Sequence, residues 1–150
     1  MRGDSGRMSG TMTLDELADN FSLFDDWEDR YRYIIDLGKK MTPLPDSAKV
    51  QANKVEGCIS QVWLTSQIEG TGAQAVLTFQ ADSDAHIVRG LLAILLILFS
   101  GKTAQQIAAI DADHELAKLD LDQHISPNRR NGVASVVRVI QGTARRLLAA

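Results

Sequence analysis

A run of nine apolar residues, Leu91 to Phe99 (LLAILLILF), constrains the fold of this chain more than any other feature. Arg89 bounds the run on one side and Gly101 and Lys102 bound it on the other, so it is far shorter than the ~20 residues that a bilayer-spanning helix needs. A helix that is apolar on nearly every side has to be buried by neighbours on several sides. We therefore expect a soluble domain with this helix at its centre.

The helix that contains the apolar run is predicted to begin near Asp82. Asp82 or Ser83 would be its N-cap, and Asp84 in the first turn would face the positive end of the helix dipole. At the other end, Gly101 can adopt the left-handed conformation that commonly follows a helix.

Capping patterns predict further helices on both sides of this one. Three pairs of residues have the spacing of a capping box, in which two side chains satisfy backbone N–H groups reciprocally. These pairs are Thr13 with Glu16, Asp25 with Glu28, and Thr103 with Gln106. Asp111 can cap a short helix, and Ser126 followed by Pro127 predicts the start of the last one.

The apolar residues change from a helical to an alternating period in the middle of the chain. Two alternating runs, Gln61–Ile68 and Val76–Gln80, are separated by Gly70-Thr71-Gly72, which predicts an antiparallel hairpin. A hairpin alone is only marginally stable, and Lys49–Val55 is the candidate for a third strand. The order helices, hairpin, helices predicts an α+β fold with a small antiparallel sheet of about three strands, packed on one side by helices.

The chain of 150 residues fits one domain. Residues 1–12 contain Gly, Ser and charge but no apolar segment, so we expect a disordered lead rather than a secretory signal, followed by one domain over residues 13–150. Without an export signal the expected compartment is the cytoplasm. The formal charge of −3 lacks the basic footprint of phosphate-backbone binding, so nucleic acid is not an expected partner. A membrane is not expected either, because the longest apolar run is too short to span one.

Cys58 is the only cysteine, so the chain can form no internal disulfide and no metal site with several thiolates. A lone cysteine in an intracellular domain is commonly a small buried apolar residue. Cys58, however, follows Gly57 at the end of a polar stretch and comes just before the first predicted strand. A loop presents a thiol to another protein better than a core strand does, so Cys58 is the first candidate for a reactive residue.

Four stretches of the chain resemble, in order and spacing, the SufE-like family of sulfur-acceptor proteins. They are Val55-Glu56-Gly57-Cys58-Ile59-Ser60-Gln61-Val62-Trp63; Tyr33–Gly38 following Trp27-Glu28; Asp82-Ser83-Asp84-Ala85 with Arg89-Gly90-Leu91 behind it; and Gln123–Gly132. The succession of G-C-x-S-x-V-W, D-S-D-A and S-P-x-R makes the resemblance specific, and it extends from about Leu14 to Leu148. Ile59 and Arg130 differ from the residues that are commoner in the family.

The resemblance implies a fold like that of the iron–sulfur scaffold proteins (IscU-like) and a function in sulfur transfer. It implies that the chain accepts sulfane sulfur from a pyridoxal-phosphate-dependent cysteine desulfurase, SufS-like or a paralogue, as a persulfide on Cys58. It further implies that the chain stimulates the desulfurase and passes the sulfur to a SufBCD-like assembly scaffold. The chain would be a sulfurtransferase-like accessory protein rather than a stand-alone enzyme, with no cofactor of its own because the pyridoxal phosphate belongs to the desulfurase. A homodimer is an open alternative to a monomer.

The resemblance also implies roles for residues other than Cys58. Arg129 would position the cysteine loop or favour the thiolate, whereas an ordinary exposed helix arginine is the alternative. Support of the cysteine loop, or contact with a partner, is implied for a further set of residues. This set is Gly57, Gln61, Trp63, Asp82 and Asp84. Ordinary packing of Trp63, and helix capping by the two aspartates, are the alternatives.

Two other functions stay open at this point. The chain could be a non-catalytic module that stimulates a desulfurase, with Cys58 dispensable, or a mononuclear metal-binding domain using Cys58 and histidines. The three histidines, His86, His114 and His124, lack metal-ligand spacing, and we expect them to be solvated or core residues.

The last predicted helix is basic, whereas the first quarter of the chain is acidic. The basic residues are Arg138, Arg145 and Arg146, and the acidic ones are Asp15, Glu16, Asp19, Asp25, Asp26, Glu28 and Asp29. Such faces are either simply solvated or serve to dock a charged partner.

Overall fold

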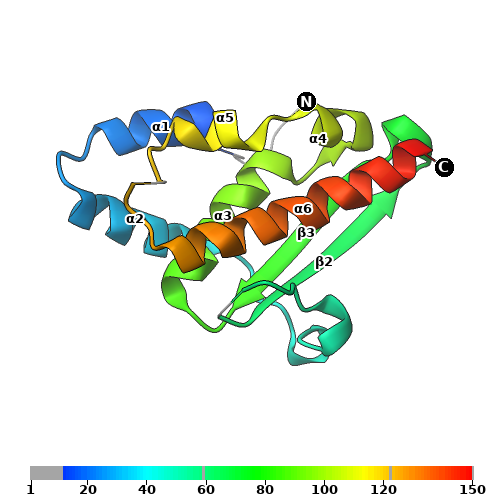
Figure 1. Ribbon diagram of the computed structural model, residues 1–150, viewed down its shortest axis with the longest axis horizontal. Helices are drawn as coiled ribbons and strands as arrows, with labels where there is room; N and C mark the ends of the chain where they lie inside the picture. Colours follow the sequence, from blue (N-terminus) through cyan, green and yellow to red (C-terminus); the bar gives the residue numbers. More distant parts are fainter. Residues whose placement is uncertain (1–11, 59, 122, 150) are drawn as a thin grey trace.

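The apolar run lies in α3 (His86–Phe99) of the computed structural model, which describes residues 12–58, 60–121 and 123–149 (Figure 1). All but two of the residues from Gly90 to Phe99 are buried, which confirms the predicted central helix. Residues 1–11 of the predicted lead lie outside the described part. Within that part, no helix has the length and apolar character that a bilayer crossing requires.

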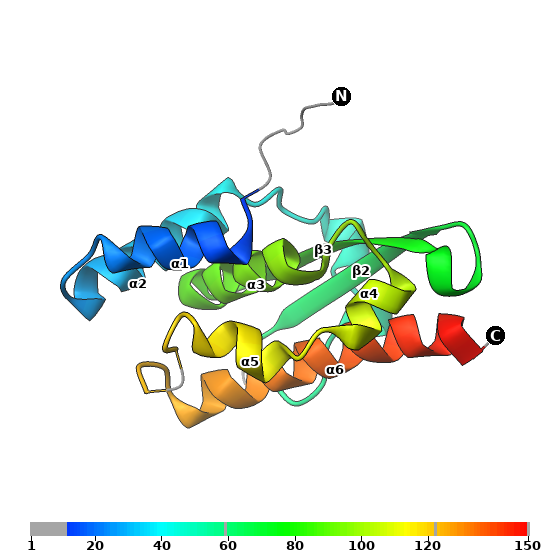
Figure 2. The same cartoon turned by 90° about the horizontal axis from the view of Figure 1, so that it is seen from above.

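Helices surround α3 on two sides. Figure 2 shows α3 between the pair α1 (Leu14–Ser22) and α2 (Trp27–Lys40) and the long α6 (Pro127–Ala149). Two short helices, α4 (Ala104–Ala109) and α5 (Ala112–Ala117), connect α3 to α6. The central helix is therefore enclosed by elements from both ends of the chain.

The sheet has the strand order β2-β3-β4. β2 (Val62–Glu69) and β3 (Val76–Ser83) form the predicted antiparallel hairpin, and a 3-10 turn, η3 (Gly72–Gln74), lies in their connection. Alternate residues of β3 from Leu77 to Ala81 are buried and those between them are exposed, so helices cover one face. The α+β class with three antiparallel strands is confirmed.

The third strand was predicted in the wrong place. It is β4 (Lys102–Thr103), which pairs with the start of β3, and not Lys49–Val55. The latter segment carries the 3-10 turn η2 (Gln51–Asn53), preceded by η1 (Asp46–Ala48), and meets β2 through a single bridge at Lys54. The side-chain amide of Asn53 donates to the Ala48 carbonyl at 2.9 Å, and such local bonds compete with a strand ladder.

The helix ends follow the predicted capping chemistry at most positions. Both Thr13 and Thr103 form complete capping boxes, and Asp111 caps α5. Ser126 Oγ accepts from the backbone N–H of Arg129 at 3.2 Å at the start of α6. The predicted start of α2 is wrong by one residue, because Asp26 and not Asp25 caps it.

The predicted cap of α3 is also wrong. Ala85 is the N-cap and contributes no side-chain bond, whereas Asp82 and Ser83 are the last residues of β3. The ladder continues to Val62 opposite Ser83, so both residues are held in extended conformation next to the first residues of β2. At the other end, Gly101 has the expected positive φ, at 82°.

Two glycines allow α2 and α3 to cross with their backbones in contact. A Cβ atom at Gly90 would lie 2.2 Å from the Ile34 carbonyl oxygen, and one at Gly38 would lie 2.6 Å from the Gly90 nitrogen. Gly38 is therefore needed for the close approach.

We expect Gly90→Ala to lower the free energy of unfolding by about 3 kcal/mol, the upper range for overpacking, because the helix backbones have to separate. Urea unfolding measures this. Gly142→Ala on α6 is the matched control, since a Cβ there meets only the end of a flexible arginine at 3.9 Å. The control should be stabilised by roughly 1 kcal/mol through helix propensity. Equal unfolding midpoints for the two variants would contradict the crossing argument.

Candidate functional site

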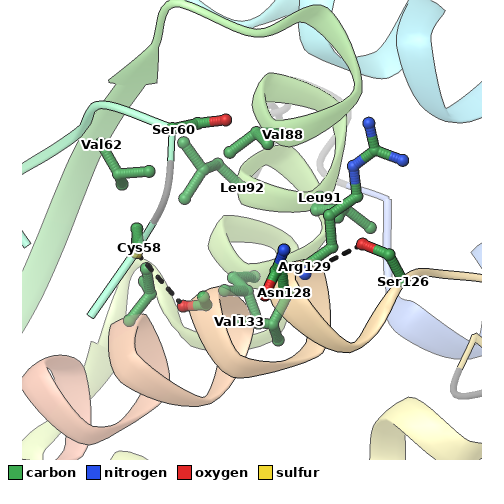
Figure 3. Close-up of a pocket in the computed structure, with 13 residues that line it drawn as sticks. Cys58, Ser60, Val62, Val88, Leu91, Leu92, Ser126, Asn128, Arg129 and Val133 are labelled. Atoms are coloured by element: carbon green, nitrogen blue, oxygen red, sulfur yellow. Dashed lines mark hydrogen bonds between the residues drawn. The ribbon is translucent and has the colours of Figure 1, made fainter.

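Cys58 lies in the loop between η2 and β2, and we call the described residues 54–58 and 60–61 of this loop the cysteine loop. The Cys58 side chain is half-buried. Figure 3 shows the side chain directed towards α6. The Sγ atom lies 3.7 Å from the Gly132 carbonyl oxygen, to which the thiol donates a weak hydrogen bond. The resting thiol is therefore turned towards the last helix.

The cysteine loop rests on two small residues of α6, Gly132 and Ser135. Gly57 has φ +91°, which glycine adopts without strain, and a Cβ atom there would lie 2.6 Å from Ser135 Oγ. A Cβ atom at Gly132 would lie 3.5 Å from Cys58 Sγ, in van der Waals contact. Gly57 is thus required by both the conformation of the loop and the space above α6.

Asp84 holds the base of the cysteine loop. Its Oδ1 accepts from the Gln61 N–H at 3.1 Å, and its own N–H donates to the Gln61 carbonyl at 3.4 Å. Trp63, on β2, is half-buried, with the ammonium of Lys49 5.8 Å from its ring centre. The structure brings Gln61, Trp63 and Asp84 together at the start of the hairpin, and their roles in function stay predictions.

Asp82 is a buried charge rather than a helix cap. Its carboxylate contacts the guanidinium of Arg89, accepts from the Leu44 N–H at 3.0 Å and lies 3.6 Å from Lys49 Nζ. Arg89 donates in addition to two backbone carbonyls at the end of α2. This pair ties β3 to α2 and to the segment that leads to the cysteine loop.

A cavity of about 320 Å³ lies beside Cys58, between α3 and α6 (Figure 3). Most of its wall is apolar and comes from both helices. The apolar residues are Val62, Val88, Leu91, Leu92, Leu95, Val133 and Val136. Ser60, Ser126, Asn128 and Arg129 add polar groups. A small group attached to the sulfur of Cys58 would therefore have apolar space next to it.

Arg129 lies in the first turn of α6 and lines the same cavity. In Figure 3 its guanidinium passes Leu91 and points away from Cys58. The structure thus brings Arg129 to the wall of the cavity that contains Cys58, as the resemblance implies, while its effect on the thiolate stays a prediction.

Burial raises the pKa of the Cys58 thiol, and the Glu56 carboxylate raises it further. Both causes disfavour the negative thiolate, the first by desolvation and the second by repulsion. In the described conformation Cys58 is therefore held as a neutral, weakly nucleophilic thiol.

We expect the pH midpoint for alkylation of Cys58 by iodoacetamide to lie above that of a peptide of residues 54–62, because the thiolate is the reacting form. The raised pKa also affects stability. The preference for the neutral thiol stabilises the folded chain at pH values below the unfolded-state pKa of Cys58, and this stabilisation is lost as the pH rises through its folded-state pKa. Glu56→Gln should lower the midpoint, and Glu69→Gln, at the far end of β2, should not. A midpoint at or below that of the peptide would contradict the assignment.

The sequence interpretation gave no role to three residues of the site, namely Glu56, Gly132 and Ser135. Gly132 and Ser135 are three positions apart and lie on one face of a helix. That spacing of small residues is the signal that could have indicated a close contact, but nothing local connects it to a loop more than seventy residues earlier.

The histidines do not form a site with Cys58 in the described structure. Among the described residues, no three His, Cys, Asp or Glu side chains gather into a group that could hold a metal ion. His124 stacks on Trp27 with ring centres 4.0 Å apart, while His86 begins α3 and His114 lies in α5. The metal-binding alternative thus receives no support from the geometry.

Comparisons with known proteins bear on the same residues. A family model described as SufE, Fe-S metabolism associated domain, matches residues 15–144. A protein of Rhizobium meliloti described as an uncharacterized SufE-like protein is 48% identical over 132 residues, covering 88% of this chain and 94% of the relative. A SufE-like protein of Rhizobium etli, described in the same way, is 47% identical over 133 residues, covering 89% and 90%.

The fold has a counterpart among solved structures. The solution structure of a hypothetical protein from Thermus thermophilus matches with a TM-score of 0.70 at 16% identity, covering 93% of this chain and 100% of that chain. At this identity the likeness concerns the fold alone.

Proposed function

Because the chain belongs to the SufE family, whose domain is associated with iron–sulfur metabolism, we propose that it accepts sulfur on Cys58 and carries it to an assembly scaffold. The donor is a cysteine desulfurase of the SufS-like kind, which keeps its pyridoxal phosphate, and the receiver is a SufBCD-like scaffold. The observation that carries the proposal is a half-buried thiol on a loop, next to an apolar cavity of about 320 Å³.

The transfer is an exchange between a thiol and a persulfide. The Cys58 thiolate attacks the outer sulfur of the donor persulfide, the donor S–S bond breaks, and its electron pair leaves on the donor cysteine thiolate. A new S–S bond forms on Cys58, and the proton lost by Cys58 is balanced by the one that the donor thiolate takes up. The exchange needs no external oxidant, and a second exchange passes the sulfur to the receiver.

The resting conformation fits a carrier whose loading is faster when a partner engages it. Cys58 faces α6 as a neutral thiol, so a donor that draws the cysteine loop away from Gly132 speeds the attack. After loading, the apolar cavity offers the outer sulfur a place away from small thiols and oxidants, to which an exposed persulfide is lost.

Intact mass spectrometry tests the proposal. The chain is incubated with a cysteine desulfurase and L-cysteine, and we expect it to gain the mass of one sulfur atom. Peptide mapping should place the sulfur on Cys58, and dithiothreitol should remove it. A desulfurase that carries its own persulfide while the chain stays unloaded would contradict sulfur transfer to Cys58.

Arg129→Ala should slow sulfur uptake, because the substitution removes the cation from the cavity wall. We expect a decrease of about tenfold, which corresponds to the loss of one charge-assisted hydrogen bond. The unfolding midpoint should stay unchanged, since Arg129 is exposed. Single-turnover loading followed by mass spectrometry gives the rate. Arg145→Ala, an exposed arginine later on α6, is the control. Equal rates for both variants would reduce Arg129 to a surface residue.

A further inference from the structure

A second cavity, of about 470 Å³, lies between the cysteine loop and the C-terminal half of α6. Its wall is formed by residues 52–56, which lead to Cys58, and by α6 from Ser135 onwards. Three cations line it, Lys54, Arg138 and Arg146, and we call it the basic groove. Glu56 is the one carboxylate among its lining residues. The chain as a whole has a formal charge of −3, so the positive charge of this groove is opposite in sign to the net charge of the chain.

The two arginines of the basic groove are arranged along one line of α6. Arg138, Gly142 and Arg146 are spaced by four residues, so they share a helix face. A Cβ atom at Gly142 would lie 3.9 Å from Arg146 Nη1, which shows that the Arg146 side chain folds back over the glycine towards Arg138. Gly142 has no side chain that would crowd the Arg146 guanidinium.

The cations of the basic groove lack acidic partners within the described part of the chain. Arg138 donates to Ser135 Oγ at 3.0 Å and Arg146 donates to Thr143 Oγ1 at 3.2 Å, both neutral hydroxyls. By contrast, Arg89 and Lys118 are paired with carboxylates. The basic groove therefore carries a net positive charge, three cations against the one carboxylate of Glu56.

The basic groove is connected to the position of Cys58 through one hydroxyl. Ser135 Oγ accepts from Arg138 and is also the atom against which Gly57 packs. A carboxylate that pairs with Arg138 therefore acts on the side chain beside which Gly57 lies. The basic groove and the resting place of the cysteine loop share Ser135.

We propose that the basic groove docks an acidic segment of the protein that donates sulfur to Cys58. Carboxylates pair with guanidinium groups in two-point fashion, and the exposed side chain of Val139, which also lines the groove, offers apolar contact. Residues 54–56 of the groove wall lead directly to Cys58, so a protein docked there is placed beside the thiol that takes up the sulfur. The inference rests on the proposed function and adds the docking surface and the charge of the partner.

The test compares Arg146→Glu with Arg145→Glu. The two residues are neighbours on α6, both are exposed, and the substitutions change the net charge equally, but only Arg146 lines the basic groove. The probe is the desulfurase that loads Cys58 in the mass measurement. For Arg146→Glu we expect the half-saturating concentration for loading to rise about tenfold or more and to depend less on salt. For Arg145→Glu we expect a change of less than about twofold.

A second donor separates this proposal from the proposed function. Glutathione persulfide should load Cys58 equally in the wild-type chain and in Arg146→Glu, because a small donor needs no groove. If the wild-type chain accepts sulfur from neither the desulfurase nor glutathione persulfide, the proposed function itself is refuted. If the desulfurase loads Arg146→Glu and Arg145→Glu with the same half-saturating concentration, the docking role of the basic groove is overturned and the proposed function stands. Arg146→Glu that is loaded normally but delivers sulfur poorly would overturn the assignment to the donor.

Discussion

The variant Cys58→Ser is expected to take up no sulfur from a cysteine desulfurase, because the hydroxyl cannot act as the nucleophile or hold a sulfane sulfur. The fold should be kept, since Cys58 is half-buried and its hydrogen bond to Gly132 is weak. We expect the free energy of unfolding to change by less than about 1 kcal/mol. Mass spectrometry after incubation with desulfurase and L-cysteine, together with urea unfolding, measures both.

A matched control and a second readout make the result decisive. Ser60→Ala changes a neighbouring residue of the same cavity but keeps the thiol, and it should load normally. Desulfurase turnover, followed as alanine production, should be stimulated by the wild-type chain and not by Cys58→Ser. Full stimulation by the serine variant would instead identify the chain as a regulatory module in which Cys58 is dispensable.

Asp82→Ala is expected to lower the free energy of unfolding by about 3–5 kcal/mol, the cost of breaking a buried ion pair by removing one partner. The Asp82 side chain is 1% exposed and that of Arg89 is 18% exposed, so the guanidinium would be left without its charge partner in a largely buried place. The Leu44 N–H would lose its acceptor as well. The shift of the urea midpoint at constant slope measures the loss.

Two further variants keep this prediction testable if the alanine variant does not fold. Asp82→Asn retains an acceptor for the Leu44 N–H and should lie between the wild-type chain and Asp82→Ala. Glu28→Ala breaks the exposed pair with Arg32, whose side chains are 75% and 68% exposed, and should cost about 0.5 kcal/mol or less. Similar midpoints for the Asp82 and Glu28 variants would contradict the structural importance of the buried pair.

The elements that local rules determine were predictable from the sequence. The apolar run, the hairpin around Gly70-Thr71-Gly72 and the two threonine capping boxes depend on residues a few positions apart, and each forms as expected. Asp82 was not predictable in this way, because its partner at Leu44 is 38 residues distant and the ladder extends over the expected helix cap. The local capping pattern was overridden by strand pairing.

The candidate site was also predictable only in part. A glycine next to a cysteine, just before an alternating run, was enough to single out Cys58 and its loop. Only the family resemblance pointed to the start of the last helix, through Arg129. The contact with Gly132 was not predictable from a local pattern, since Cys58 and Gly132 are 74 residues apart. The same holds for the basic groove, which combines Lys54 with arginines of the last helix.

Because α6 is one continuous helix of 23 residues, it fixes the spacing and direction of every side chain along it. Gly132, Ser135, Arg138 and Arg146 are separated by a rise of about 1.5 Å per residue and a turn of about 100°. One residue inserted between Ser135 and Arg138 would rotate both arginines by about 100° away from the cysteine loop while leaving its resting place intact. Relatives that share the groove should therefore vary in side chains along this stretch but keep its length unchanged.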